Sequence, residues 1–265
     1  MITHIVTPVI AMAALGLVFG VGLAYALKLF RIEVDPATFM ILSKLPGSNC
    51  GACGKAGCAA FAEALAKHET IPAGCVVSNE EARKSISELM GLEHKAKVKL
   101  IATLLCNGGT RAKDKYAYQG IKTCKAASLV FGGQKACSFG CLEFGDCVIG
   151  CPFGAIKMGA NNLPKVDPNK CTACGICVKV CPKQLYELTP INCSYYVKCK
   201  STDPGGAVMK VCSVGCIGCM KCEKACPAAY KVENNLARVN YGRCETEGIE
   251  KGAEVCPTKV IIKRG

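Results

Sequence analysis

The sequence contains no tryptophan, only 6% aromatic residues and three histidines in 265 residues. Few large apolar side chains are therefore available to build a core outside the most hydrophobic segment. Three imidazoles also offer little material for acid–base catalysis or for histidine-ligated metal sites. We expect something other than apolar packing to supply much of the folding free energy, as bound metals do in other proteins with small cores.

Several motifs of nucleotide and haem chemistry are absent as well. No G-x-G-x-x-G follows a strand-like run, no G-x4-G-K-[ST] occurs, and no C-x2-C is followed by histidine. These absences exclude a dinucleotide-binding fold, a P-loop and c-type haem attachment. No basic segment carries interleaved aromatic residues, which argues against nucleic acid as a partner.

Cysteine, by contrast, is abundant, with 23 residues. The N-terminal apolar run has no basic segment before it and no A-x-A site after it, so we expect no cleavable signal. In such a chain, closely spaced C-x2-C repeats favour metal binding over a disulfide scaffold. We therefore expect a reducing compartment and cysteines that hold metal clusters.

Residues 5–27 form an uncharged, mainly apolar run. A helix of this length spans about 34 Å, enough to cross a bilayer core of roughly 30 Å. Lys28 and Arg31 follow the run, whereas no Lys or Arg precedes it, so the positive-inside rule places the rest of the chain in the cytoplasm. The sequence predicts a single-pass anchor, 1–28, in the cell (inner) membrane, with the cysteine-bearing body on the cytoplasmic side. A buried core helix is the alternative.

Residues 29–98 contain the pattern C-x2-C-x4-C, followed 17 residues later by a fourth cysteine. Four thiolates suit either zinc or a [4Fe–4S] cluster, and the ferredoxin-type run further along the chain favours the cluster. Next, Ser78 and Glu81 form a capping-box signature that predicts a charged surface helix within 78–97. The predicted cluster ligands are Cys50, Cys53, Cys58 and Cys75.

The most specific pattern is the run C-x2-C-x2-C-x3-C-P that ends at Pro182. In ferredoxins the first three thiolates of this run hold one [4Fe–4S] cluster, and the fourth ligates a neighbouring cluster. We therefore predict two clusters in a ferredoxin-like module, 136–185. The first is held by Cys151, Cys171, Cys174 and Cys177.

The second cluster of this module lacks its middle ligand, because Phe144 stands where a cysteine is expected. Cys137, four residues before Cys141, is the replacement that the spacing offers. The predicted ligands of this cluster are Cys137, Cys141, Cys147 and Cys181.

The sequence repeats after about 75 residues. Cys124 and Cys199 each lie 13 positions before the matched pair Cys137 and Cys212. The second copy, 212–265, is a degenerate ferredoxin-like module that keeps one complete ligand set. That set is Cys216, Cys219, Cys222 and Cys256.

The other half of the second copy retains only Cys226 and Cys244, because residues 245–254 lack the middle cysteines. Two thiolates do not hold a [4Fe–4S] cluster. One interpretation is that Cys199 or Cys212 completes the site. The alternative is a lost cluster that leaves buried thiols behind, since free cysteine packs well as a small hydrophobe. The same interpretation covers Cys106, Cys124 and Cys193.

Together these patterns predict an α+β protein with a single transmembrane helix, a small helical [4Fe–4S] module and two tandem ferredoxin-like modules. A lead-in segment, 99–135, precedes the first ferredoxin-like module, and a connector, 186–211, follows it. We expect four [4Fe–4S] clusters, within a range of three to five. Four clusters carrying about −2 each reduce the formal charge of +13 to about +5, a balance that suits an acidic partner or membrane face.

The order of these segments resembles the iron–sulfur (B) subunits of the Rnf family, the membrane-bound, ion-translocating ferredoxin:NAD oxidoreductases. The most specific parts are the stretches 45–58 and 137–155. The resemblance implies an electron-transfer component of a translocase that accepts electrons from reduced ferredoxin. It further implies transfer to other membrane and cytoplasmic subunits, coupled to Na⁺ or H⁺ movement, with no independent catalysis by this chain. A relay to another acceptor, such as a redox-sensing regulator, without ion pumping is the alternative. A zinc scaffold or nucleic-acid module is a third.

Overall fold

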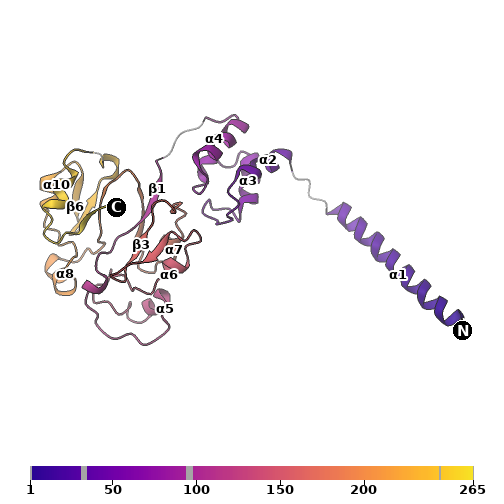
Figure 1. Ribbon diagram of the computed structural model, residues 1–265, viewed down its shortest axis with the longest axis horizontal. Coiled ribbons are helices and arrows are strands. Elements are labelled where there is room, and N and C mark those ends of the chain that lie inside the picture. The colour runs from indigo at the N-terminus through magenta and orange to yellow at the C-terminus, as the bar shows by residue number, and fades with distance from the viewer. Residues whose placement is uncertain (1, 31–34, 94–97, 245, 265) are drawn as a thin grey trace.

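The computed structural model describes residues 2–30, 35–93, 98–244 and 246–264. Three sets of residues used in the predictions above lie outside these ranges. They are Arg31 of the charge pattern after the apolar run, residues 94–97 of the segment 78–97, and Glu245 of the segment 245–254. The described residues form short helices and strands together with one long helix, α1, at the N-terminal end (Figure 1). This mixture confirms the predicted α and β content.

Helix α1 (Ile2–Leu29) projects away from the remaining elements (Figure 1). Its segment Ile10–Leu29 has a mean hydropathy of 2.2, and none of it is buried against protein. Within the described residues it is the one helix that is long and apolar enough to cross a membrane. An apolar helix without protein cover is stable in an apolar surrounding such as a bilayer.

A small helical unit follows, with its elements packed round a few large side chains. Ile41, Phe61, Leu65 and Ile86 are all buried in one cluster. Asp35 caps the first helix of the unit by accepting a hydrogen bond from the main chain two residues on. The elements are α2 (Pro36–Lys44), α3 (Cys58–Ala66), the 3₁₀ turn η1 (Pro72–Gly74) and α4 (Glu80–Leu89).

The start of α4 differs by one residue from the capping box in the sequence. Asn79 is the N-cap, and its side-chain oxygen accepts a hydrogen bond from the Ala82 amide at 2.8 Å. Ser78 is buried just before the helix. Asn and Ser are equally good N-caps, so the predicted helix is confirmed and its capping residue is corrected.

The next part of the chain forms two antiparallel strand pairs with short helices between them. The outer pair is closed by a buried hydrogen bond of 2.6 Å between the hydroxyls of Thr103 and Thr189. The outer strands come from the predicted lead-in and connector segments, which therefore pair with each other. The elements are β1 (Leu100–Leu104) paired with β4 (Tyr186–Pro190), β2 (Ile156–Met158) paired with β3 (Pro164–Val166), η2 (Gly109–Arg111), α5 (Cys124–Leu129), α6 (Asp146–Ile149) and α7 (Ile176–Val180).

The C-terminal part repeats this order of strand, helix, hairpin, helix and strand. Arg264 joins the two parts, because its guanidinium donates hydrogen bonds to the hydroxyls of Thr103 (3.2 Å) and Thr189 (2.7 Å). The elements are β5 (Tyr195–Val197) paired with β8 (Ile261–Lys263), β6 (Tyr230–Glu233) paired with β7 (Leu236–Val239), α8 (Gly205–Val211), α9 (Lys221–Ala225), η3 (Tyr241–Arg243) and α10 (Ile249–Glu254).

Four of the short helices begin in the same way, directly after a residue in the left-handed conformation. These residues are Gly145, Gly175, Met220 and Gly248, with φ between 59° and 85°. A left-handed residue reverses the chain sharply, and glycine adopts it without strain. In α6, α7 and α9 this turn places a buried cysteine within the first helical turn.

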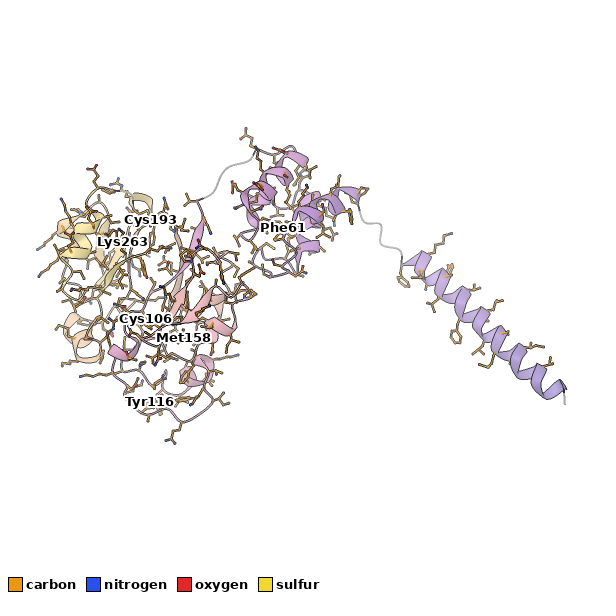
Figure 2. All side chains as sticks on the ribbon, in the orientation of Figure 1. Phe61, Cys106, Tyr116, Met158, Cys193 and Lys263 are labelled. Carbon is orange, nitrogen blue, oxygen red and sulfur yellow. A yellow bond between two sulfur atoms is a disulfide. The ribbon has the colours of Figure 1, made fainter. Side chains whose placement is uncertain are left out.

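The described residues contain four buried apolar clusters, and each of them includes cysteine side chains. Aliphatic residues are few, and Tyr230 and Phe61 are the largest side chains that are fully buried. Figure 2 shows Phe61 in the helical unit and Cys106 and Cys193 in the remainder of the chain, each a member or neighbour of a different cluster. The interior is therefore organised around thiols.

Candidate iron–sulfur sites

The four cysteines predicted for the N-terminal unit line one cavity of about 10 Å³. The loop that carries them is held by Asn49, whose side-chain oxygen accepts a hydrogen bond from the Cys58 amide at 2.8 Å. Gly57 lies against that oxygen, and a Cβ there would approach it to 2.9 Å. The loop therefore brings together the whole predicted set, Cys50, Cys53, Cys58 and Cys75.

The first set of the central part is also brought together. Burial raises the pKa of Cys174, and the neighbouring charges of Cys151 and Cys171 raise it further. Burial likewise raises the pKa of Cys177 to about 12, with Cys171 and Cys174 adding to the effect. The Ala102 amide of β1 donates to the Cys171 sulfur at 3.5 Å.

The second central set differs from the prediction at one position. A cavity of about 20 Å³ is lined by Cys141, Cys147 and Cys181, as expected, but its fourth cysteine is Cys124. Cys137 lines a different cavity.

Helix α5 explains this difference. The Asp146 carboxylate accepts hydrogen bonds from the amides of Cys124 (2.8 Å) and Lys125 (3.0 Å), which docks the first turn of α5 on α6. The Cys124 thiol is thereby held beside Cys147, which lies next to Asp146 in the same helix. The fourth thiol is thus supplied by the tertiary contact, whereas the spacing pointed to Cys137.

Two polar groups face the sulfurs of this cavity. The Tyr186 hydroxyl donates to the Cys147 sulfur at 3.3 Å, and the Leu185 amide donates to the Cys181 sulfur at 3.4 Å. Burial raises the pKa of Cys141, with the neighbouring thiols adding to it. Hydrogen bonds of this kind stabilise negative charge on sulfur in a site from which water is excluded.

In the C-terminal part, a cavity of about 20 Å³ is lined by the complete predicted set. The Ala237 amide donates to the Cys216 sulfur at 3.4 Å, as the Ala102 amide does to Cys171. Burial raises the pKa of Cys222 to about 11, and Cys216 and Cys256 add to it. The lining thiols are Cys216, Cys219, Cys222 and Cys256.

The incomplete set does not assemble. Cys244 forms a disulfide with Cys193, and Cys226 is a buried free thiol. Cys199 and Cys212, which were candidates to complete this set, line a cavity with Cys137 instead.

The local structure explains why this half-site lacks ligands. Helix α10 keeps the left-handed start at Gly248, but the residue at the position of the helix cysteine is the exposed Glu250. The ring of Tyr230 packs on α10 so closely that a Cβ at Gly252 would lie 2.2 Å from it. Its hydroxyl donates to the Ile249 carbonyl at 2.8 Å. The backbone turn of a cluster site is therefore retained at the start of α10, but the Tyr230 side chain fills the space beneath it.

Thiols of neighbouring sets lie close enough to interact electrostatically. Besides its own set, Cys50 of the N-terminal unit raises the pKa of Cys174, after burial. In the same way Cys147 contributes to the raised pKa of Cys177, after burial and its own set. The N-terminal set therefore lies within electrostatic range of the first central set, and cysteines of the first and second central sets share one buried cluster.

Comparison with known proteins agrees with these positions. Residues 45–77 match a family model described as a putative Fe-S cluster, and residues 163–186 match one described as a 4Fe-4S binding domain. The first range contains the N-terminal set, and the second contains the run from Cys171 to Cys181.

Three curated relatives align with nearly the whole chain, and each is named as the B subunit of its complex. The chain is 39% identical to that of the Na(+)-translocating ferredoxin:NAD(+) oxidoreductase complex of Acetobacterium woodii, over 98% of this chain and 78% of the relative. It is 38% identical to that of the ion-translocating oxidoreductase complex of Methanosarcina acetivorans, over 98% of both. It is 43% identical to that of the proton-translocating ferredoxin:NAD(+) oxidoreductase complex of Clostridium ljungdahlii, over 95% of this chain and 90% of the relative. The chain belongs to the B-subunit family of ion-translocating oxidoreductase complexes.

Membership in the B-subunit family confirms the resemblance to the Rnf iron–sulfur subunits that the motifs indicate. The residues present also fit [4Fe–4S] clusters. Each cavity offers four cysteine sulfurs, and main-chain amides donate to sulfurs in three of the sets. Within the described residues, no three His, Cys, Asp or Glu side chains are grouped closely enough to hold a single metal ion. Four cysteine thiolates are the ligand set of a [4Fe–4S] cluster.

Sequence reasoning left four cavity-lining cysteines without a role. A signal exists in the repeat for three of them, Cys124, Cys199 and Cys212, because the copies are offset by 75 residues. The same offset relates Cys124 to Cys199 and Cys137 to Cys212. The repeat therefore contains ligand positions outside the ferredoxin-type runs, although it does not reveal which of them share a cavity.

Proposed function

We propose that this chain is the membrane-anchored iron–sulfur relay subunit of an ion-translocating ferredoxin:NAD oxidoreductase. The observation that carries the proposal is the succession of four-thiol sets in a chain of which 95–98% aligns with three B-subunit relatives. The names of these relatives state ferredoxin and NAD as redox partners and Na⁺ or protons as the transported ion. This chain accepts electrons and passes them on, and other subunits reduce NAD⁺ and transport the ion.

The proposed ligands follow from three cavities and from the group formed by Cys151, Cys171, Cys174 and Cys177. They belong to the N-terminal unit and to two tandem ferredoxin-like modules. The first module includes β1 and β4 and so extends beyond 136–185 at both ends. The ligand sets are Cys50, Cys53, Cys58 and Cys75; Cys151, Cys171, Cys174 and Cys177; Cys124, Cys141, Cys147 and Cys181; and Cys216, Cys219, Cys222 and Cys256.

A [4Fe–4S] cluster supplies reversible one-electron storage without proton transfer. The protein's own groups hold the sulfurs in place and set the energy of the added charge. The amides of Ala102, Leu185 and Ala237 stabilise negative charge on the sulfurs they contact, and burial beneath Tyr186 excludes water. A rigid arrangement of adjoining sets suits electron transfer, which needs short distances and little reorganisation.

The anchor places this relay at a membrane. Helix α1 is the proposed single span, and Lys28 in its last turn supports a cytoplasmic position for the cysteine-bearing body. The N-terminal set follows the span in the sequence, so we assign it to the membrane end of the relay. The basic charge of the chain suits reduced ferredoxin as an acidic donor.

Ion uptake tests the proposal. Vesicles that contain the complete complex should accumulate Na⁺ or protons when reduced ferredoxin and NAD⁺ are added, and uptake should stop in the Cys171→Ala variant. Electron transfer to a different acceptor, with no ion uptake by coupled vesicles, would favour a relay that serves a redox-sensing regulator. A chain that ferredoxin cannot reduce contradicts both.

A further inference from the structure

A cavity at the junction of the two ferredoxin-like parts is lined by four cysteines that have no place in the sets above. It has a volume of about 20 Å³, the same as the cavities of the second central set and the C-terminal set. Figure 2 labels Cys106 at this junction. The four thiols are Cys106, Cys137, Cys199 and Cys212.

Main-chain hydrogen bonds join the segments that carry these cysteines. The Lys113 amide donates to the Val211 carbonyl at 2.8 Å, and the Ala136 amide donates to the Lys113 carbonyl at 2.8 Å. Ala112 and Cys212 form an antiparallel bridge. Segments far apart in the sequence are thus fixed around one point, as a preformed ligand site requires.

A buried ion-pair network supports the same junction. The Lys135 side chain is only 4% exposed, and its ammonium group lies 3.1 Å from the Asp114 carboxylate and 2.6 Å from that of Glu143. It also donates to the Gly109 carbonyl at 3.2 Å. Because its buried ammonium group contacts two carboxylates and a carbonyl, Lys135 holds the segments before and after Cys137 in one arrangement.

Glycine keeps the space between two of the sulfurs open. A Cβ at Gly108 would lie 3.6 Å from the sulfur of Cys106 and 3.6 Å from that of Cys212. It would also lie 3.0 Å from the Ala112 side chain, tighter than an ordinary contact. The two sulfurs therefore face a common space that the backbone leaves free.

We infer that Cys106, Cys137, Cys199 and Cys212 hold a further [4Fe–4S] cluster at the junction of the two ferredoxin-like parts. With this set, the cysteines of the chain divide into five groups of four and three remaining residues. The remaining residues are the disulfide pair Cys193 and Cys244 and the buried thiol Cys226. Ligation of a preassembled [4Fe–4S] core involves no redox change: each thiol releases one proton, and its sulfur binds one iron of that core.

The position of this set gives the cluster a role, which rests on the proposed relay function. The cavity is lined by Gly140, next to Cys141 of the second central set, and by Gly215, next to Cys216 of the C-terminal set. The junction set therefore adjoins one set on each side, and it links the two ferredoxin-like parts into a single path.

Metal and sulfide analysis tests the inference on the full-length chain, purified anaerobically in detergent with its clusters. The inference predicts about 20 iron and 20 acid-labile sulfide per chain without stoichiometric zinc. Cys106→Ala should lower both counts to about 16. The matched variant Cys226→Ala removes a buried thiol outside every set and should leave the counts unchanged.

The inference is overturned if the wild-type chain holds about 16 iron and Cys106→Ala loses none, or if Cys106→Ala retains about 20 iron. It is also overturned if the chain holds one zinc that is lost in Cys106→Ala, or if Cys226→Ala loses four iron. If Cys106→Ala does not fold, Cys199→Ala on the other side of the junction gives the same comparison, and the wild-type count decides independently. These counts require neither ferredoxin nor ion transport. The site can therefore fail while the proposed function holds, and the proposed function can fail while the site holds.

Discussion

Cys124 and Cys137 lie 13 residues apart and are both partly or fully buried, yet they line different cavities. Asp146 accounts for the position of Cys124, because its carboxylate accepts hydrogen bonds from two amides at the start of α5. Cys137 lies beyond the Lys135 ion pairs and lines the junction cavity. A single side chain thus decides which thiols can share a cluster.

The role of Cys124 is directly testable at this scale. Cys124→Ala should remove one ligand of the second central set and lower the iron content by about 4 per chain. Cys193→Ala is the control, since it removes a disulfide cysteine outside every set and should leave iron unchanged. Iron analysis of the anaerobically purified full-length variants provides the measurement. Unchanged iron in Cys124→Ala would mean that another residue completes this set.

Asp146 provides a second residue-scale prediction. Asp146→Asn keeps one side-chain oxygen but loses the carboxylate that accepts two amides, so α5 should dock less firmly on α6. Hydrogen bonds to charged acceptors contribute about 1.5–3 kcal/mol, and loss of part of this should destabilise α5 locally. Hydrogen exchange of the amides in α5 should become faster, whereas exchange in α4 of the N-terminal unit serves as the internal reference. Equal protection in both proteins would show that this contact does not position Cys124.

At the scale of elements, helix α10 shows how a cluster site is lost while its backbone remains. The left-handed turn at Gly248 is retained, but Tyr230 fills the interior and packs against Gly252. Tight packing of an aromatic ring on a helix tolerates no added volume.

This contact predicts a specific sensitivity. A Cβ at Gly252 would lie 2.2 Å from the Tyr230 ring, so Gly252→Ala should destabilise the C-terminal part by about 1–3 kcal/mol. Gly206→Ala is the matched control, because Gly206 is also helical and has no atom within 4 Å of the added methyl group. Helix propensity alone should make that control neutral or stabilising by up to about 1 kcal/mol. Thermal unfolding of the two anaerobic holo-variants separates them, and equal midpoints would refute the packing argument.

The apolar helix α1 makes a further prediction at this scale. Leu15 and Val18 are exposed in the middle of the span, and a lysine at the centre of a membrane helix costs about 2.5–3.5 kcal/mol. The double replacement L15K/V18K should therefore shift a large share of the chain out of the membrane fraction. The apolar double replacement L15I/V18L should leave the distribution unchanged. Retention of the lysine variant at the wild-type level would argue against a membrane-spanning α1.

At the scale of the whole molecule, the five proposed clusters would form one path, with the junction cluster between the two ferredoxin-like parts. Loss of the junction cluster should divide the relay. After mixing the Cys106→Ala chain with reduced ferredoxin, freeze-quench electron paramagnetic resonance should show one part reduced at the wild-type rate and the other delayed by at least about tenfold. The Cys226→Ala chain should follow the wild type. Simultaneous reduction in all three chains would show that electrons bypass the junction.

The sequence was sufficient for features that depend on local spacing. The cysteines that the spacing groups into the N-terminal set and the C-terminal set each line a single cavity, since residues close in sequence need only a tight loop to meet. The helix after Ser78 was predicted with an error of one residue at its cap. In these places local chemistry determines local structure.

The sequence was insufficient where contacts between distant segments decide the outcome. Nothing in the spacing of Cys124 shows that Asp146 draws it to Cys147, and nothing near Cys106 shows that it meets Cys212. The pairing of β1 with β4 likewise joins residues more than 80 positions apart and places the predicted lead-in within the first ferredoxin-like part. The 75-residue repeat marks cysteines such as Cys124 and Cys199 as corresponding positions, but only the fold shows which cavity each of them lines.

The most direct test of the relay is an anaerobic titration of the full-length holo-chain with reduced ferredoxin, followed by electron paramagnetic resonance. We predict that the chain takes up more than one electron from ferredoxin and that signals of reduced [4Fe–4S] clusters appear as it does so. A chain that accepts no electrons from ferredoxin, with its clusters intact, would contradict the relay function.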